Sequence, residues 1–296
     1  MPSSQAAVAE THALQSAETM RFVQELGAAV SGAPLELPSY PDVAMRMQRV
    51  LSDPNSNTAR VVKIVGSDPM LAARVITMAN SAAMNRSGKS ATDLQEAVAR
   101  IGFDALRSAA IGFAMAQLRK ASAFRDIEKH LTALWQHNVS CAAMSYVVAK
   151  KLRRVSPDVA MLAGLVSEVG KIYILTKASK YPALFGDPVS YREVVRDWHP
   201  QVARSVLENW QMPDEIVEAV GGYEESADDH SARSALTDIL SVAVTLVQLG
   251  DSPDMLTARL AQHRGAARLR ITPEAVAELL VESVGEVASL REALGQ

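Results

Sequence analysis

Apolar residues recur at helical spacing along almost the whole chain, and this periodicity constrains the fold more than any other feature. Positions i, i+3, i+4 and i+7 of one segment are occupied by Leu94, Ala97, Val98 and Ile101. The same pattern returns further on with Val202, Ala203, Val206, Leu207 and Trp210. Such spacing places apolar side chains on one side of an α-helix, whereas a strand alternates with a period of two. Alternating segments bounded by turn residues are nearly absent, so the sequence predicts an all-α fold.

Small polar residues and prolines indicate where the helices begin. Thr92 and Gln95 are spaced as a capping box in front of the first apolar stripe. Proline suits the first turn of a helix because the N–H that it lacks would have no partner there. On this basis helix starts are predicted at Ser52–Asp53–Pro54, Ser67–Asp68–Pro69, Ser156–Pro157, His199–Pro200, Met212–Pro213 and Thr272–Pro273.

The predicted organisation is one main helical domain with an extension at each end. Residues 1–33 are expected to form an N-terminal tail or loose helix, and residues 34–250 the domain itself, in two parts, 34–122 and 123–250. Residues 251–296 are expected to form a C-terminal helical extension that ends in a helix from Pro273 to Leu294. One side of that helix carries Val276, Leu279, Leu280, Val284, Val287 and Leu290. This stripe must pack on its own domain or across a homodimer.

Composition and charge exclude several classes of function. With a net charge of −3, the chain has no excess of Lys and Arg to neutralise a phosphate backbone, so no DNA partner is expected. The single cysteine, Cys141, excludes an internal disulfide and a Cys-rich zinc site, and its Ala and Val neighbours predict burial. The longest apolar stretch, around Ile239–Leu249, is too short to span a bilayer. Because the first ten residues also lack a signal-peptide pattern, we expect a cytoplasmic protein without membrane contact.

Several polar features are interpreted as structural. The basic run Lys150–Arg154 lies at the predicted end of a long helix, where cations complement the helix dipole and stay solvated. The stretch Tyr223–Ser231 is predicted to be an acidic surface loop. Asn80–Ser81 follows an apolar helix, where such side chains cap carbonyls or hold the next loop. Surface positions are expected for four histidines, His12, His130, His230 and His263.

A set of short segments, taken together, resembles a known family. The segments are Leu37–Ala44, Val65–Val75, Met78–Ala82, Leu94–Gly102, Leu106–Arg107, Leu134–Asn138, Leu162–Leu165, Gly170–Lys171 and His199–Val202. On these motifs the chain resembles the HDOD family, the output-domain relatives of His–Asp metal-dependent phosphohydrolases, over about Leu37 to Leu249. The resemblance implies a family-specific N-terminal helical bundle packed on a helical core related to the hydrolases. It also implies a role in bacterial signal transduction.

The resemblance further indicates where the ligands of an active metal centre would stand. The defining His–Asp dipeptide falls on Ser167–Glu168, and two other histidine ligands fall on His137 and His199. A histidine pair common in the relatives falls on Tyr223–Glu224, and the final aspartate falls on Val244. Serine is a poor ligand for a divalent metal and an aliphatic side chain is none at all, so the ligand set is broken.

The resulting interpretation is a vestigial pocket with no catalytic residue, no metal and no cofactor. Its members are His137, Ser167, Glu168, Lys171, His199, Tyr223, Glu224 and Val244. Glu168 and Lys171 are spaced i, i+3 on one predicted helix, so we expect an ion pair in which the ammonium takes the place of a metal cation. The alternative is a metal site with two histidines and one carboxylate, made by His137, Glu168 and His199.

Three functions are consistent with these positions. The leading hypothesis is a non-enzymatic regulatory module of signal transduction that binds other signalling proteins, with components of cyclic-dinucleotide or guanosine-polyphosphate pathways among the candidates. The first alternative is a metal-dependent phosphohydrolase or phosphodiesterase that acts on nucleotides through His137, Glu168 and His199. The second is a nucleotide sensor without turnover, in which the pocket near Lys171 holds a phosphate.

Overall fold

The computed structural model describes residues 4–32, 35, 37, 42–85, 87–224 and 233–294. Every element in these ranges is a helix, which confirms the predicted all-α fold. In chain order the elements are α1 (Ser4–Ser31), α2 (Asp42–Ser52), α3 (Thr58–Val65), α4 (Pro69–Ala79), α5 (Leu94–Lys120), the 3₁₀ helix η1 (Ser122–Ile127), α6 (Glu128–Leu152), α7 (Pro157–Val166), α8 (Val169–Ala178), α9 (Pro182–Phe185), α10 (Pro188–Asn209), α11 (Asp214–Gly222), α12 (Ala235–Leu249), α13 (Pro253–Ala261), α14 (Arg264–Leu269) and α15 (Pro273–Ala293). Most of the stretch Tyr223–Ser231, including His230, lies outside the described residues, as does most of the segment between Leu37 and Asp42.

Acidic side chains cap several of these helices. Asp68 accepts hydrogen bonds from N–H groups of the first turn of α4, and Pro69 opens that helix as predicted. At α5 the cap is Asp93, whose side chain accepts from the N–H of Glu96 at 2.8 Å. The predicted box of Thr92 and Gln95 is therefore wrong by one residue, because the carboxylate that reaches the first turn belongs to the next position.

Two of the predicted proline starts are also wrong. Pro200 lies inside α10, which begins twelve residues earlier at Pro188 and is capped by Asp187. His199 is therefore an interior residue of a long helix and not a helix cap. The other case is Ser52–Asp53–Pro54, because α2 ends at Ser52 and α3 begins only at Thr58. Local spacing alone does not tell a first-turn proline from one that follows or interrupts a helix.

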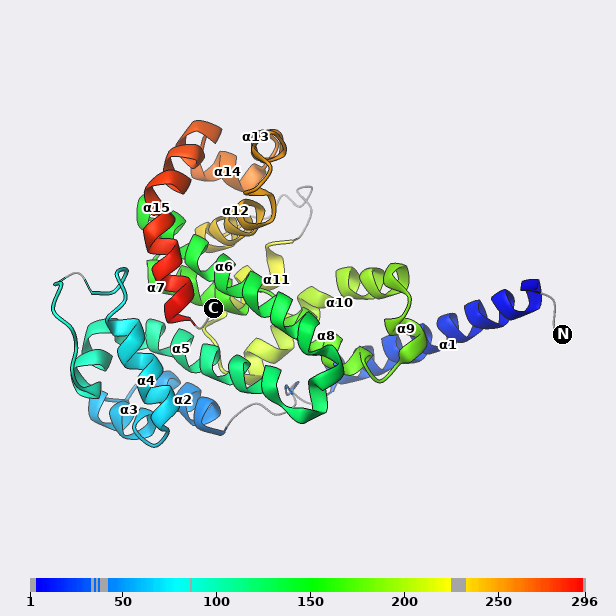
Figure 1. Ribbon diagram of the computed structural model, residues 1–296, viewed down its shortest axis with the longest axis horizontal. Helices are drawn as coiled ribbons and strands as arrows, with labels where there is room; N and C mark the ends of the chain where they lie inside the picture. Colours follow the sequence, from blue (N-terminus) through cyan, green and yellow to red (C-terminus); the bar gives the residue numbers. More distant parts are fainter. Residues whose placement is uncertain are drawn as a thin grey trace.

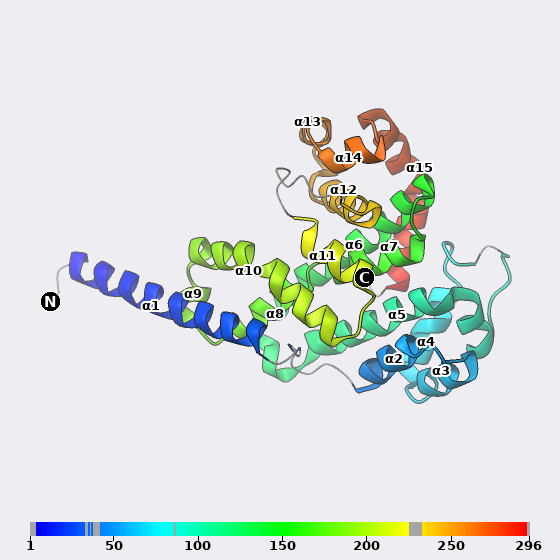
Figure 2. The ribbon, with the colours of Figure 1, turned by 180° about the vertical axis from the view of Figure 1, so that it is seen from behind.

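The helices form two packed groups around one continuous hydrophobic core. Helices α2, α3 and α4 pack against α5, whereas α6 and α7 lie along each other at the centre of the second group (Figure 1). Helix α10 packs on α8 and α11, and α12 packs on α6, α7 and α11. The view from behind shows α1 extending away from the body beside α9 and α10 (Figure 2). Buried apolar side chains connect all of these parts, from Phe22 in α1 to Leu294 at the end of α15.

The last helix, α15, packs on its own chain against α6 and α4. Arg74 of α4 donates a hydrogen bond to the carbonyl of Leu294 at 2.9 Å. Most of the predicted apolar stripe faces the core, but Val284 is 66% exposed and does not. The correction follows from geometry, since the helices that contact α15 cover a narrower sector of its surface than the stripe occupies.

One stretch, Pro157–Ala178, is long and apolar enough to cross a membrane, with a mean hydropathy of 1.5. It comprises α7 and α8, and 89% of its apolar window is buried inside the molecule. Its apolar character is thus accounted for by packing against the surrounding helices. Among the described residues it is a longer apolar stretch than the predicted one at Ile239–Leu249, which belongs to the shorter helix α12.

Candidate functional site

Two glycines let the helices that carry the candidate residues approach one another closely. A Cβ atom on Gly164 of α7 would lie 2.6 Å from the carbonyl oxygen of Cys141 on α6. A Cβ atom on Gly170 of α8 would lie 2.5 Å from the carbonyl oxygen of His199 on α10. Both distances are shorter than any ordinary van der Waals contact, so only glycine fits. The short turn between α7 and α8 is therefore held between α6 and α10.

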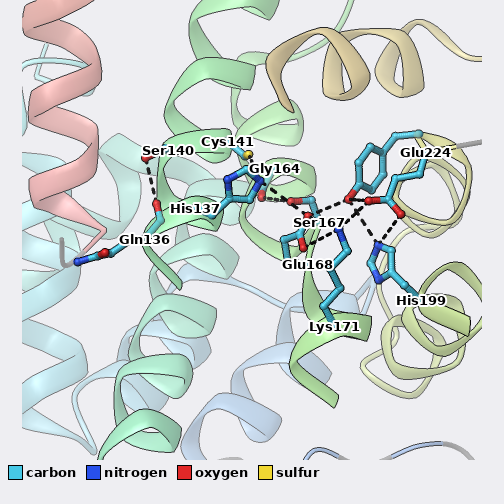
Figure 3. A network of polar contacts seen from close by, with 11 residues as sticks. Gln136, His137, Ser140, Cys141, Gly164, Ser167, Glu168, Lys171, His199 and Glu224 are labelled. Atoms are coloured by element: carbon cyan, nitrogen blue, oxygen red, sulfur yellow. Dashed lines mark hydrogen bonds and ion pairs between the residues drawn. The ribbon is translucent and has the colours of Figure 1, made fainter. Parts of the chain in front are cut away.

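This packing brings six of the eight predicted residues into one polar cluster (Figure 3). We call it the Lys171 cluster, and its members are His137, Glu168, Lys171, His199, Tyr223 and Glu224. At its centre the Lys171 ammonium lies 2.9 Å from Oε2 of Glu168 and 2.7 Å from Oε1 of Glu224. The predicted pair of Lys171 with Glu168 is present, and the second carboxylate comes from Glu224 in the turn after α11, 53 residues away in the sequence.

The Tyr223 hydroxyl connects the two carboxylates. It lies 2.9 Å from Oε1 of Glu168 and 3.0 Å from Oε1 of Glu224, and it can donate its one hydrogen to either. Its oxygen is also 3.4 Å from Nε2 of His199. The side chain is buried, and that burial is the main reason why the pKa of Tyr223 is raised well above its ordinary value. The phenol is therefore a neutral donor and not an anionic ligand.

The two histidines flank the cluster at longer distances. Nε2 of His199 lies 3.7 Å from Oε2 of Glu224, and Nε2 of His137 lies 3.8 Å from Oε1 of Glu168. His137 also contacts the Cys141 thiol, 3.3 Å from Nε2. Burial lowers the pKa of both imidazoles, so both are neutral at pH 7. Cys141 was not among the predicted site residues, although its i, i+4 spacing from His137 could have indicated the contact.

The central charges are kept ionised by one another. Burial is the largest single effect on Glu168 and would raise its pKa, but Lys171, together with His199 and His137, holds that pKa below its ordinary value. In the same way, burial would lower the pKa of Lys171, while Glu168 and Glu224 raise it above its ordinary value. The site is therefore a compact group with one ammonium between two carboxylates, flanked by neutral imidazoles.

The remaining two predicted residues do not join the cluster. The hydroxyl of Ser167 is buried and donates to the carbonyl of Gly164 at 2.9 Å, which ties it to the end of α7. Val244 of α12 lines a neighbouring cavity that also contacts Tyr223 and Glu224. The Ser167 hydroxyl is engaged by the backbone and valine has no polar atom, so neither side chain bonds to the cluster.

The residues present do not fit the metal centre that the fold suggests. Within the described part of the chain, no group of three or more His, Cys, Asp or Glu side chains is arranged to hold a metal ion. The two carboxylates that point toward each other are bridged by an ammonium and a phenol instead. A dication at this position would have to displace Lys171 against its attraction to both carboxylates.

Comparison with known proteins gives a family for this arrangement. The profile of the HDOD domain matches residues 37–225, which is more than half of the chain. The chain belongs to the HDOD family. No curated protein gives a significant match.

Three solved structures share the HDOD fold. A protein from Shewanella amazonensis SB2B, named a "Putative metal-dependent phosphohydrolase", is 26% identical with a TM-score of 0.73, over 94% of this chain and 99% of that one. An HDOD domain protein with unknown function from Geobacter sulfurreducens is 18% identical with a TM-score of 0.63, over 95% and 97%. A protein from Marinobacter aquaeolei VT8, named a "Putative signal transduction protein", is 20% identical with a TM-score of 0.56, over 95% and 66%.

Proposed function

We propose that this HDOD protein is a non-enzymatic regulatory module that acts in bacterial signal transduction, in the cytoplasm, by binding other signalling proteins. The observation that carries the proposal is the position of Lys171, whose ammonium lies between Glu168 and Glu224. In a metal-dependent hydrolase the carboxylates of such a site face a dication that polarises a phosphoryl oxygen and acidifies a water. Here the same carboxylates already face an ammonium, which can do neither.

The electrostatic balance of the cluster supports this proposal. Lys171 is 20% exposed and Glu168 only 3%, so their attraction is weakly screened by solvent. Removing the ammonium from the carboxylates would leave two anions facing each other in a buried site, which is costly. A metal would therefore compete with a pre-formed ion pair, and it would lack the carboxylate that Val244 replaces.

A metal-dependent phosphohydrolase acting on nucleotides is the rival function. Two observations favour it, namely the name of the Shewanella relative and the survival of His137, Glu168 and His199 around one point. In this alternative Lys171 would turn away, and the three side chains would hold a metal with open positions for water and substrate. The two functions differ in whether Lys171 stays between the carboxylates and opposes metal binding or turns away and leaves the position open to a metal.

The decisive experiment compares metal binding in three forms of the full chain. The wild type, K171A and H137A/H199A are equilibrated with Mn²⁺, passed through a desalting column and assayed for retained metal. We expect less than stoichiometric metal in the wild type, equal to that in H137A/H199A, and tighter Mn²⁺ binding by K171A. Hydrolysis of a chromogenic phosphodiester and of cyclic dinucleotides is measured in parallel, and no turnover above the buffer blank is expected.

The opposite result would establish the rival function. One equivalent of metal per wild-type chain, lost in H137A/H199A and accompanied by turnover that the same variant lacks, overturns the proposal. The partner itself is sought by affinity capture with the full chain from the native cell. The K171M variant is used as the comparison bait, because a partner that contacts the Lys171 cluster should be captured in smaller amount by this variant than by the wild type.

The idea that Lys171 itself holds the phosphate of a nucleotide messenger has less support. Its ammonium contacts two carboxylates, so this group contributes no net positive charge to an incoming anion. A nucleotide that bound there would face the carboxylates of Glu168 and Glu224 at short range.

A further inference from the structure

Helix α15 has a second apolar face, which the described part of the chain leaves uncovered. Val281 is 78% exposed and Val284 66%, whereas Val276 and Leu290 on the core side of the same helix are buried. Figure 1 shows α15 on the near side of the molecule, and the view from behind in Figure 2 draws it on the far side. The two valines therefore point away from the body of the protein. Exposed apolar side chains that gather on one face are typical of an interaction surface.

The exposed face follows the spacing of a coiled coil. Ala277, Val281, Val284 and Ala288 are separated by four, three and four residues, and all four are exposed. Such alternation of three and four residues places side chains along one line of a helix, which is the line that meets the partner in a coiled coil. Gly285 borders this line, and no atom lies within 4 Å of the position of a Cβ there. A second helix can therefore approach the line closely.

The exposed line reads the same in both directions, namely alanine, valine, valine, alanine. Two identical helices that pack antiparallel about a two-fold axis make reciprocal contacts. An axis between residues 282 and 283 places Val281 of one copy beside Val284 of the other, and Ala277 beside Ala288. Each apolar residue of the line thus meets an apolar residue of a second copy.

Charges at the two ends of the line complement each other about the same axis. Glu274 and Arg291 are exposed and continue the spacing by three residues on either side. The axis brings Glu274 of one copy level with Arg291 of the other. Arg291 also has an interaction within its own chain, but its five N–H donors allow it to bind a further carboxylate. The exposed Glu292 lies next to this pair, so the end charges favour the antiparallel direction more than they add affinity.

The residues beside the line fit the same pairing. On one side the exposed Glu278 of one copy is brought near Gly285 of the other, which has no side chain to oppose it. On the other side Leu280 and Val287 come together, and both are only partly buried in the single chain. The pairing therefore covers apolar surface on this side as well.

We propose that α15 mediates a homodimer, in which this face packs antiparallel on the same face of a second copy. Glu282 and Glu286 keep their ion pairs with α6, because they lie on the other side of the helix. One helix on one helix is at the small end for a protein interface, so the dimer should dissociate on dilution. The inference does not depend on the function proposed for the Lys171 cluster, which lies on other helices.

The test measures the molecular mass of the full chain by analytical ultracentrifugation over a series of concentrations. We expect a monomer–dimer equilibrium in the wild type and a dissociation constant at least tenfold higher in V281E. The matched control is V189E, which places the same charge on an exposed valine of α10 and should leave the constant unchanged. Thermal unfolding checks that all three proteins are folded.

A charge swap tests the antiparallel pairing. R291E and E274R each bring like charges together across the axis, and each should raise the dissociation constant roughly threefold or more. E274R/R291E restores opposite charges and should return the constant toward that of the wild type. The two positions are seventeen residues apart in one helix, which is about 25 Å, so a recovery comes only from contact between copies.

Four results would overturn the inference. The first is a wild type that stays monomeric at every concentration, and the second is a dimer that V281E leaves unchanged. The third is a double variant E274R/R291E whose dimer is no stronger than that of either single variant. The fourth is a monomeric wild type that captures another protein from the native cell and loses it in V281E, because the face then binds that protein instead.

Discussion

At the scale of single residues, the Lys171 ammonium decides what the cluster can do. Its spacing from Glu168 is local, and the ion pair between them could be predicted from three residues of helix. Its contact with Glu224 could not, because that carboxylate belongs to the turn after α11, 53 residues further along the chain. The second contact is what turns a pair within one helix turn into a group that joins two distant segments of the chain.

Removing this ammonium should destabilise the fold. In K171M the carboxylates of Glu168 and Glu224 lose their shared cation, and Glu168 remains 3% exposed with its charge uncompensated. Removing one partner of a buried ion pair lowers the free energy of unfolding by about 3 kcal/mol, so the urea concentration at the unfolding midpoint should fall. K180M, an exposed lysine just after the same helix, is the control and should leave the midpoint unchanged. If the urea midpoint falls no further in K171M than in K180M, the described ion pairing of Lys171 is contradicted.

The buried imidazole of His199 should make stability depend on pH. Burial lowers its pKa, even though Glu224 and Glu168 near it act in the opposite direction. The unfolded chain therefore takes up a proton at about pH 6.5, where the folded protein does not, and stability falls as the pH is lowered from there. Glu168 acts only at lower pH, because its pKa lies below the ordinary value.

Unfolding free energies measured between pH 7.5 and 5.5 check this expectation. The wild type should lose stability steadily over the interval, and H199Q should show a shallower slope whatever its absolute stability. The exposed His130 gives the control variant H130Q, which should keep the slope of the wild type. Equal slopes in all three proteins would show that His199 is not the group responsible.

At the scale of helices, close approach at glycine positions the cluster. A methyl group on Gly164 would collide with the backbone of α6 at 2.6 Å, and backbone cannot move aside cheaply. Residues 163–165 match the family resemblance noted from the sequence, but the reason for a glycine there is visible only when α6 lies against α7.

Two glycine substitutions test this packing. G164A should destabilise the protein by about 2 kcal/mol through overpacking between α6 and α7. G285A lies on the exposed side of α15 with no atom within 4 Å of the new methyl, so it should stabilise by about 0.5–1 kcal/mol through helix propensity. Thermal unfolding of both variants provides the measurement. A G164A protein as stable as the wild type would show that α6 and α7 are farther apart than described.

At the scale of the whole molecule, α15 ties the two helical groups together. It packs on α6 and α4 through buried apolar residues, and its flank carries ion pairs from Lys150 to Glu286 at 2.5 Å and from Lys151 to Glu282 at 2.9 Å. The sequence predicted the basic run at the end of α6 as a solvated helix end, and both lysines are about half exposed. Their partners on α15 were not predicted.

The buried apolar contacts of α15, and not its ion pairs, should hold this helix in place. L290A removes a fully buried side chain and should cost about 3 kcal/mol. K150A/K151A removes two solvent-screened pairs and should change the unfolding free energy by no more than the error of the measurement. Chemical denaturation of both variants separates the two contributions, and a larger loss in K150A/K151A than in L290A would reverse the assignment.

The amount that could be predicted differs between fold and site. Helical periodicity predicted the all-α architecture, and short motifs predicted the family, because both depend on residues close together in the chain. The Asn80 side chain likewise bonds the N–H and carbonyl of Ala91, at 2.7 and 3.0 Å, and so holds the next loop as predicted. Helix starts were less certain, since the cap at Asp93 and the interior proline at Pro200 differ from the predicted pattern by local detail alone.

The sequence by itself determined which donors are present, and the family resemblance predicted that Val244 and Ser167–Glu168 stand where an active metal centre would have ligands. Only the tertiary structure placed Glu224 against Lys171 and formed the cavity that Tyr223, Glu224 and Val244 line beside it. The reason is physical. Residue identity is a property of the sequence. Charge compensation and cavities arise from contacts between distant segments, and the packing of the whole core sets the distance between those segments.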